Sequence, residues 1–176
     1  LMSRLSMVFQ DVYLFDDSLI ANIRVGRPDA SDEEVFRAAD LSGVTSIANR
    51  LGWHTPVGEG GRLLSGGERQ RVSVARALLK QAPIVLFDEA TSALDAENEA
   101  NILAAMDELR EQSTFIVIAH KLDTIKSADQ IVVLDEHGQV SQLGTHSELS
   151  DVPGIYRHFW QQRKAARGWK INSGRD

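Results

Sequence analysis

The sequence predicts an α/β protein with a parallel sheet at its core and a helical subdomain inserted near its start. Two apolar runs, residues 84–87 and 115–118, have the length of buried strands. Between them, Ile102, Met106 and Leu109 recur at helical spacing, and such a strand–helix–strand unit implies a parallel pair joined by a right-handed crossover. A chain of 176 residues that is 43% apolar and 25% charged has enough core for one domain.

A strand and a helical region come first in the chain. Residues 5–9 predict a short apolar strand that ends at Gln10, and the pattern is helical from residue 17 to about residue 80. Ser31 and the acidic residues after it predict a helix start. The apolar face expected for this helix consists of Val35, Phe36, Ala39 and Leu41. A glycine-rich loop follows, and a long helix is expected after Ser65.

The last part of the chain is predicted to add a hairpin and two helices. Residues 131–134 and 139–143 flank a turn at residues 137–138, which indicates an antiparallel hairpin. Helices are expected around residues 147–149 and over residues 156–167.

Composition and charge exclude several classes of protein. The net charge of -6 argues against a nucleic-acid binder, which would have a basic surplus. The absence of cysteine excludes disulfides and thiolate metal sites. The longest apolar runs, such as residues 115–119, are far shorter than the ~20 residues of a membrane span. No signal peptide is recognisable, and because the chain opens with Leu1 in a strand-like pattern, we expect a cropped part of a longer protein.

Residues 64–70 contain a candidate site for an anion. Ser65, Gly66 and Gly67 stand where a helix begins, and unpaired backbone N–H groups and a partial positive charge attract phosphate there. The glycines have no Cβ, so a ligand can approach the backbone closely. Ser65 and Glu68 also have the spacing of a capping box, so taken alone they are equally consistent with an ordinary helix start.

Two carboxylates, Asp88 and Glu89, directly follow the apolar run at 84–87. Ligands of open parallel sheets bind at the carboxyl ends of the strands, and paired carboxylates there need a positive partner. Mg²⁺ on the phosphates of ATP is the obvious one: Asp88 would hold the ion, and Glu89 would polarise the attacking water as general base. The alternative is an acidic cap on a helix beginning at Thr91 and Ser92.

Three further candidates stand near these strand ends. His120 closely follows the run at 115–118, where an imidazole would hydrogen-bond the terminal phosphate or the water. Gln10 ends the first strand, and its amide oxygen would join the Mg²⁺ shell. Asp95 would contact a facing subunit. Together the motifs predict nucleotide hydrolysis, although the chain contains no G-x-x-x-x-G-K-[ST] loop, which normally holds the nucleotide.

These motifs resemble those of the ATP-binding cassette (ABC) ATPases. Residues 64–70 resemble the signature motif of that family, residues 84–89 its Walker B strand and residues 92–95 its D-loop. His120 is similar to the switch histidine and Gln10 to the Q-loop glutamine. Five motifs in this order make a chance match negligible. The resemblance implies an ABC-type P-loop NTPase fold, here incomplete at its N-terminus because the Walker A loop is missing.

The resemblance extends from residue 1 to about residue 162. We therefore expect residues 1–162 to be a partial ABC ATP-binding domain, with the helical subdomain at about residues 17–80. Residues 163–176 are expected to form a C-terminal tail.

Finer features are similar to exporter-fold transporters. Residues 55–60 resemble the stretch that contacts the coupling helices of the membrane domains, with Glu59 as the coupling residue. Residues 15–23 and 144–149 are also similar to segments typical of this group. Residues 121–123 are similar to those of actinobacterial half-transporters linked to iron–siderophore uptake.

The resemblance implies a head-to-tail dimer of two ABC domains that encloses two ATP molecules with Mg²⁺. Each ATP would lie on the P-loop of one domain and be capped by the signature motif of the other. The ATP-binding domains are expected at the cytoplasmic face of the cell membrane, with transmembrane domains in the same polypeptide. Closure of the dimer would pull on those transmembrane domains through the loops of Gln10 and Glu59. The residues expected to contact the partner's nucleotide are Leu64, Ser65, Gly66, Gly67, Glu68 and Asp95.

Two other interpretations stay open beside the transporter ATPase. A catalytically silent subunit would offer residues 65–67 to a partner's ATP and bind none itself, although Glu89 and His120 argue against it. A soluble ABC ATPase of DNA repair or translation would need no coupling stretch at residues 55–60. We expect the chain alone to bind ATP poorly and to be inactive without a Walker A loop, and to have a gap in the sheet beside the Asp88 strand.

Overall fold

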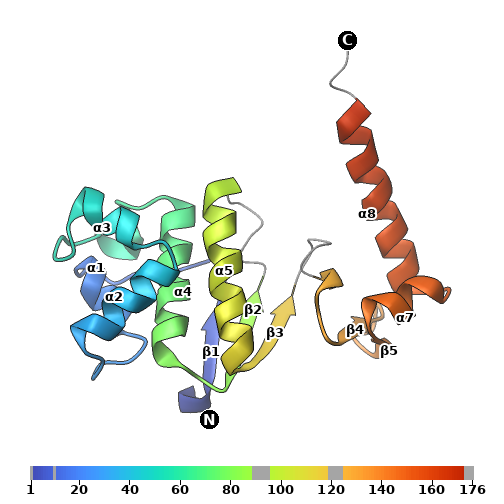
Figure 1. The fold of residues 1–176 in the computed structure, drawn as a ribbon, viewed down its shortest axis with the longest axis horizontal. Helices are drawn as coiled ribbons and strands as arrows, with labels where there is room; N and C mark the ends of the chain where they lie inside the picture. The colour runs from blue at the N-terminus through green and yellow to red at the C-terminus, as the bar shows by residue number, and fades with distance from the viewer. Residues whose placement is uncertain (1, 10, 89–95, 119–124, 173–176) are drawn as a thin grey trace. The chain divides into compact units, whose positions relative to one another are not determined.

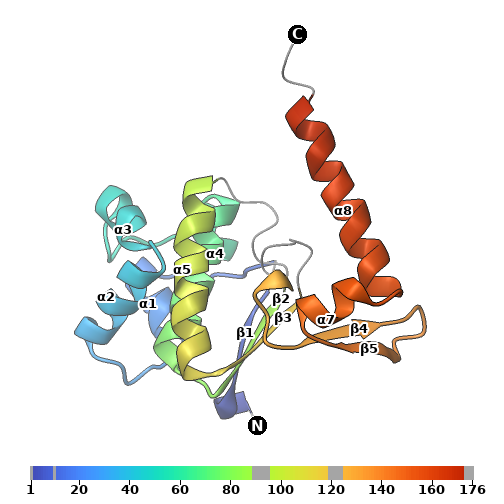
Figure 2. The same cartoon turned by 45° about the vertical axis from the view of Figure 1, so that its right-hand side comes forward.

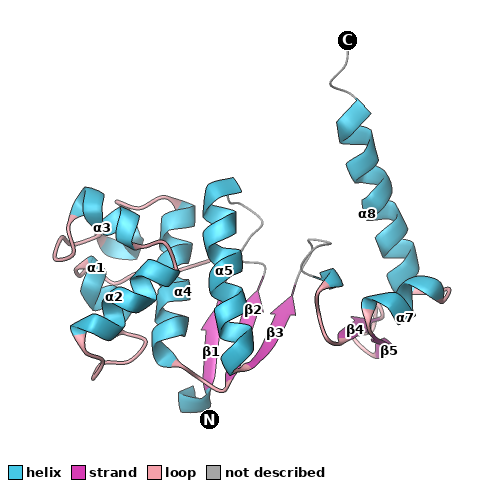
Figure 3. Ribbon diagram, viewed as in Figure 1, coloured by secondary structure: helices cyan, strands magenta, loops and turns pink. Residues whose placement is uncertain are grey.

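The computed structural model of the chain describes residues 2–9, 11–88, 96–118 and 125–172 (Figure 1). These residues form two compact units that divide after Ile118. The first unit combines a sheet with helices, and the second combines a hairpin with helices (Figure 3). Both units thus fit the predicted α/β class.

The sheet of the first unit is parallel and has three strands. Their order is β1 (Leu5–Val8), β2 (Ile84–Asp88), β3 (Thr114–Ile118), so the predicted parallel pair is confirmed. The expected gap beside the Asp88 strand is wrong, because β2 is hydrogen-bonded to β1 on one edge and to β3 on the other. Sequence periodicity identifies strands but carries no information on which strands are neighbours, and this is why the sheet order was missed.

Helices fill the long stretch between β1 and β2, as the sequence predicts. In chain order the helical elements of the first unit are η1 (Met2–Arg4), α1 (Leu19–Arg24), α2 (Asp32–Leu41), α3 (Thr45–Leu51), η2 (Glu59–Gly61), α4 (Gly66–Lys80) and α5 (Ala96–Gln112). Figure 2 shows α4 and α5 on one side of the sheet.

α4 runs antiparallel to the strands. The Lys80 ammonium at its C-terminal end donates to the carbonyls of Met2 at 3.0 Å and Leu5 at 2.8 Å, where β1 begins. The N-terminal end of α4 therefore lies at the end of the unit where the strands finish, as Figure 1 also shows. This orientation brings the predicted anion site and the predicted carboxylate site to the same end of the first unit.

The core lies between the sheet and these helices. Val8, Val85 and Phe87 alternate with less buried residues along β1 and β2 and are at most 1% exposed. On the opposite face of the sheet, Ile116 and Ile118 remain 49% and 50% exposed. Both faces of a parallel sheet are usually covered, so within the described residues only one face has its full packing.

The predicted apolar face of α2 is only half right. Val35 and Ala39 are buried as expected, but Phe36 and Leu41 are exposed. The ring of Phe36 lies 4.7 Å from that of Trp53, so it packs on the surface against the end of the α3 region and not in the core. Helical spacing does not distinguish these two kinds of apolar contact.

The second unit contains the predicted hairpin and two helices. β4 (Ile131–Leu134) and β5 (Val140–Gly144) pair antiparallel, and α7 (His146–Asp151) and α8 (Ile155–Asn172) follow. α8 continues through the boundary expected at residues 162–163 without a break in the helix. No helix within the described residues is long and apolar enough to cross a membrane.

Candidate functional site

The carboxyl ends of the three parallel strands lie at one edge of the sheet. Val8 is in register with Phe87, and Asp88 is in register with Ile118. Neighbouring strands are about 4.8 Å apart, so the ends of β1, β2 and β3 fall within the reach of one ligand. This is the edge where the sequence predicts the catalytic carboxylates.

Of the residues predicted at this edge, the structure describes Asp88, a half-buried residue that is the last of β2. Gln10, Glu89, Asp95 and His120 lie outside the described residues. Gln10 and His120 each follow their strand by two positions, and Glu89 directly follows β2. The structure therefore brings together the ends of the three strands that Gln10, Glu89 and His120 follow in the sequence.

Asp88 fits the predicted Mg²⁺ in chemistry, because carboxylate oxygen is a ligand that Mg²⁺ prefers. Among the described residues, no group of three histidine or acidic side chains is placed to hold a metal ion.

The start of α4 is a capping box, as the spacing of Ser65 and Glu68 predicts. The Ser65 hydroxyl oxygen accepts from the amide N–H of Glu68 at 3.2 Å, and the Glu68 carboxylate accepts from the amide N–H of Ser65 at 2.8 Å. Ser65 has an extended backbone, with φ -66° and ψ 165°, which suits an N-cap residue.

The cap leaves three hydrogen-bond donors at this helix end. The amide groups of Gly66 and Gly67 lie in the first turn, where no carbonyl of the helix can accept from them. The Ser65 hydroxyl is used as an acceptor, so its own O–H remains a donor. Ser65 and Gly66 are exposed. Three donors at the positive end of a helix dipole form a suitable site for a phosphate group.

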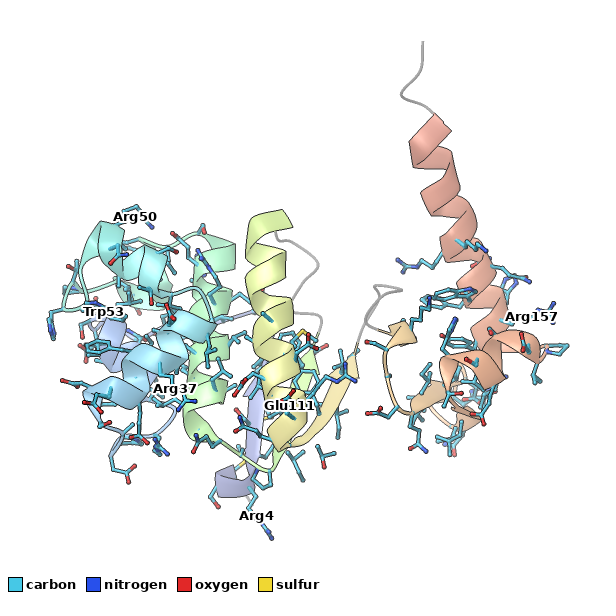
Figure 4. The ribbon with its side chains drawn as sticks, viewed as in Figure 1. Arg4, Arg37, Arg50, Trp53, Glu111 and Arg157 are labelled. Carbon is cyan, nitrogen blue, oxygen red and sulfur yellow. The ribbon has the colours of Figure 1, made fainter. Side chains whose placement is uncertain are left out.

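The other two residues predicted in this motif face their own chain. Leu64 is buried in the core at 4% exposure. The Glu68 carboxylate forms an ion pair with Arg50 of α3 in addition to its capping bond (Arg50 is labelled in Figure 4). Partial burial would raise the pKa of Glu68, but the Ser65 amide and the Arg50 guanidinium outweigh it, so the pKa lies below its usual value. Leu64 and Glu68 thus shape the helix end in the structure.

Arg69 also lies near this helix end, although no role was predicted for it. Its guanidinium donates to the Leu64 carbonyl at 2.9 Å and lies beside Gly66, where the Nη2 atom would be 4.0 Å from an added Cβ. The positive charge of Arg69 therefore adds to that of the helix end. The sequence does not reveal this, because nothing in the spacing shows that the side chain turns back toward residue 64.

The coupling loop, residues 55–61, contains the predicted coupling stretch and is held in place by backbone hydrogen bonds. The amide of Val57 donates to the carbonyl of Asp17 at 3.0 Å, and Ser18 and Pro56 form an isolated antiparallel bridge. Glu59 is exposed in this loop, in η2. The loop carrying Glu59 is thus fixed to the segment that leads into α1.

Two exposed aromatic side chains belong to that same segment. Tyr13 is 58% exposed and Phe15 is 51% exposed, and their rings meet edge to face at a centroid distance of 5.8 Å. Leu14 between them is fully buried and lies against Gly61 of the coupling loop. Tyr13, Phe15 and Glu59 therefore project from two loops that pack on each other.

A cavity of about 400 Å³ lies elsewhere in the first unit. It is lined by Arg27 and residues of α2, the end of α4 and the end of α5. None of the predicted site residues that the structure describes lines it, so we assign the function to the helix end and the strand ends.

Comparison with known proteins connects this arrangement to one family. The family described as "ABC transporter" matches residues 1–92. The chain is 48% identical over 158 residues to an ATP-dependent lipid A-core flippase of Neisseria meningitidis, covering 89% of this chain and 25% of the flippase. It is 47% identical over 170 residues to the mycobactin import ATP-binding/permease protein IrtB of Mycolicibacterium thermoresistibile, covering 96% of this chain and 29% of that protein.

A solved structure is similar as well. The structure titled "Structure of a bacterial Atm1-family ABC exporter with ATP bound" matches with a TM-score of 0.84 and 44% identity, covering 92% of this chain and 28% of the exporter. The chain thus spans between a quarter and three tenths of the relatives named here. With the family match over more than half of its residues, and with the ABC-type P-loop NTPase fold and exporter relatives, the chain belongs to the ABC transporter family.

Proposed function

We propose that the chain is part of the ATP-hydrolysing domain of an exporter-fold ABC membrane transporter, acting as a head-to-tail dimer at the cytoplasmic face of the membrane. One observation carries the proposal. The donors of Ser65, Gly66 and Gly67 lie at the same end of the first unit as the strand ends at Asp88, but in the helix layer and not in the sheet layer. In a head-to-tail dimer, the strand-end site would serve the ATP held by this chain's own domain, and the helix-end site would serve the ATP held by the partner domain.

The proposed division of labour follows from the chemistry of each group. Asp88, with Gln10, would hold Mg²⁺, which neutralises phosphate charge when bound. Glu89 would accept a proton from the attacking water, and His120 would hydrogen-bond the terminal phosphate. The donors of residues 65–67 stabilise negative charge on the partner's phosphate, because they are held in place by the cap before the ligand arrives.

The remaining predicted contacts extend this interface. Asp95 would contact the facing subunit, and Glu59 would contact a transmembrane domain of the same polypeptide. The phosphate cradle would come from residues outside this sequence, since the 176 residues contain no Walker A loop. The cargo does not carry over from the relatives, whose names cover lipid A-core flipping, β-(1→2)glucan export and mycobactin import.

The test compares two serines that form the same cap. Ser31 on α2 forms a capping box with Glu34 that matches the box of Ser65 and Glu68. In the intact transporter, Ser65→Ala and Ser31→Ala should each lower the free energy of unfolding by about 1 kcal/mol.

ATP turnover is expected to separate the two variants. Ser65→Ala should lower turnover by about tenfold or more, because it also removes a donor to the transferring phosphate, whereas Ser31→Ala should leave turnover unchanged. Equal turnover in both variants would reduce Ser65 to a helix cap and contradict the proposed function.

A further inference from the structure

A polar cluster in the first unit has no role in the function proposed so far. Arg76, in the third turn of α4, directs its guanidinium at the segment before α1 and at α1 itself. The Nε group donates to the Asn22 carbonyl at 2.7 Å, Nη2 donates to the Asn22 side-chain oxygen at 2.7 Å, and Nη1 donates to the Tyr13 carbonyl at 2.9 Å. The three acceptors are all oxygens of one segment of chain, 54 to 63 residues away in sequence.

Asn22 continues the network toward the surface. It is 0% exposed, and its side-chain oxygen also accepts from the amide of Phe15 at 2.9 Å. Its side-chain NH₂ donates to the carbonyls of Phe15 at 3.0 Å and Ser18 at 3.1 Å. The Asn22 side-chain amide therefore forms hydrogen bonds with both the N–H and the C=O of Phe15, as the backbone of a neighbouring strand would.

The segment held in this way has little structure of its own. Residues 11–17 form neither helix nor strand in the structure, and Figure 3 shows them as a loop. Besides the buried Leu14 between them, the contacts of Asn22 and Arg76 hold the segment that carries the exposed rings of Tyr13 and Phe15. The Arg76 guanidinium also lies over the Phe15 ring at 5.9 Å, which adds a cation–π contact.

The guanidinium is an unusual choice for this position. None of its bonds described above goes to a carboxylate, and burial lowers the pKa of Arg76 to about 10. Burying a charge among neutral oxygens is costly. The planar fork of arginine, however, is suited to holding several acceptors at set angles, which a single ammonium group cannot do.

We propose that Arg76 and Asn22 form a brace that makes the aromatic pair of Tyr13 and Phe15 move together with α4. Ser65 caps the N-terminal end of α4, eleven residues and therefore about 16 Å from Arg76 at 1.5 Å per residue. When residues 65–67 bind the partner's nucleotide, the helix and the aromatic pair shift as one body, and the pair transmits the shift to a membrane domain. Arg76 is a positioning residue in this scheme, and the inference rests on the proposed function.

The experiment uses the intact transporter in lipid vesicles with Mg-ATP and orthovanadate, so that no transported substrate is needed. Arg76→Lys keeps the charge but loses the fork. The control is Arg37→Lys on the exposed face of α2 (Arg37 is labelled in Figure 4). Three quantities are measured: the nucleotide trapped per dimer, the hydrogen exchange of residues 11–18, and the distance between spin labels on the outer ends of the two membrane domains.

We expect Arg76→Lys to trap nucleotide as the wild type does, because the helix end is unchanged. Exchange at the Phe15 amide should rise by about tenfold, because opening of the segment becomes easier. The vanadate-induced shift between the membrane domains should be lost. Arg37→Lys should match the wild type in all three measurements.

The outcomes separate this inference from the function on which it rests. If the wild type itself traps no nucleotide, the proposed function fails. If Arg76→Lys loosens residues 11–18 but keeps the full shift between the membrane domains, the brace plays no part in coupling and the inference is overturned, while the proposed function stands. If Arg76→Lys fails to accumulate, the exposed double variant Tyr13→Ala/Phe15→Ala decides by the same shift, and a wild-type shift there also overturns the inference.

Discussion

Ser65 and Glu68 hold each other in a reciprocal pair of hydrogen bonds, and Glu68 in turn holds Arg50. The Glu68 carboxylate thus joins the start of α4 to α3. Glu68→Ala removes both contacts and should lower the free energy of unfolding by about 1–2 kcal/mol. Glu68→Gln retains an acceptor for the Ser65 amide and should cost less than about 1 kcal/mol.

Urea unfolding of the purified chain measures both variants. The order of the two losses is the decisive result, because it distinguishes the capping bond from the charge. A Glu68→Gln variant that loses as much stability as Glu68→Ala would show that the ion pair with Arg50 stabilises the fold and that the capping bond does not.

Among the residues that the structure describes, three glutamates are capping residues, and each makes the fold sensitive to acid. The Ser31 amide lowers the pKa of Glu34, and the Thr145 amide lowers that of Glu148. For Glu68, burial acts in the opposite direction but the Ser65 amide and Arg50 prevail. Because each pKa in the folded state lies below the ordinary value of 4.5, the stabilisation is complete above that pH and is lost as the pH falls through the folded values.

The corresponding measurement is the urea midpoint at a series of pH values from about 7 down to about 3. The wild type should lose stability below about pH 4.5, and a variant with glutamine at positions 34, 68 and 148 should show a flatter profile there. Parallel profiles for the two proteins would show that other carboxylates cause the acid sensitivity.

The sequence predicts local features of this fold well. The caps at Ser31 and Ser65 follow from a serine with an acidic residue three positions later, and the hairpin of β4 and β5 follows from two short segments on either side of a turn. Each of these depends on residues that are close in the chain. For the same reason, the position of Asp88 at a strand end is visible in the sequence.

Features that depend on distant residues were not predictable. The bonds between Arg76 and Asn22 join positions 54 residues apart, and no periodicity indicates them. Gln81 has a positive φ of 50°, which a residue other than glycine rarely adopts, and its side chain accepts a hydrogen bond from Arg27. The pairing of β1 with β2 also depends on residues distant in the chain, so the gap expected beside the Asp88 strand was wrong.

Adjacent glycines of the coupling loop allow a controlled test of packing. Gly60 and Gly61 both have positive φ, 64° and 72°, so alanine is strained at either position. An added Cβ at Gly61 would lie 2.8 Å from the Leu14 side chain, whereas at Gly60 nothing lies within 4 Å. Gly60→Ala should therefore cost about 1 kcal/mol from backbone strain alone, and Gly61→Ala about 2–3 kcal/mol.

Urea unfolding again gives the two values, and their difference measures the close contacts at Gly61, with the Leu14 side chain at 2.8 Å and the Arg69 side chain at 3.0 Å. Equal losses would mean that Leu14 moves aside without cost. In that case Leu14 would not fix the coupling loop to the segment of Tyr13 and Phe15.

Glu89 directly follows β2, whose last residue Asp88 lies between the ends of two neighbouring strands. A general base at this point needs a carboxylate, and glutamine keeps the size and a hydrogen-bonding oxygen but is not basic enough to accept the proton. In the intact transporter, Glu89→Gln should keep ATP binding and lower phosphate release by about 10²-fold or more.

The matched control is Glu111→Gln, an exposed residue near the end of α5 that is labelled in Figure 4. It carries the same chemical change at a position outside the strand ends, so it should bind and hydrolyse ATP as the wild type does. Binding is measured with a labelled nucleotide and turnover as phosphate released per minute. Phosphate release by Glu89→Gln at the rate of Glu111→Gln would remove Glu89 from the role of base, and the proton of the attacking water would then have to go to another acceptor at the same strand ends.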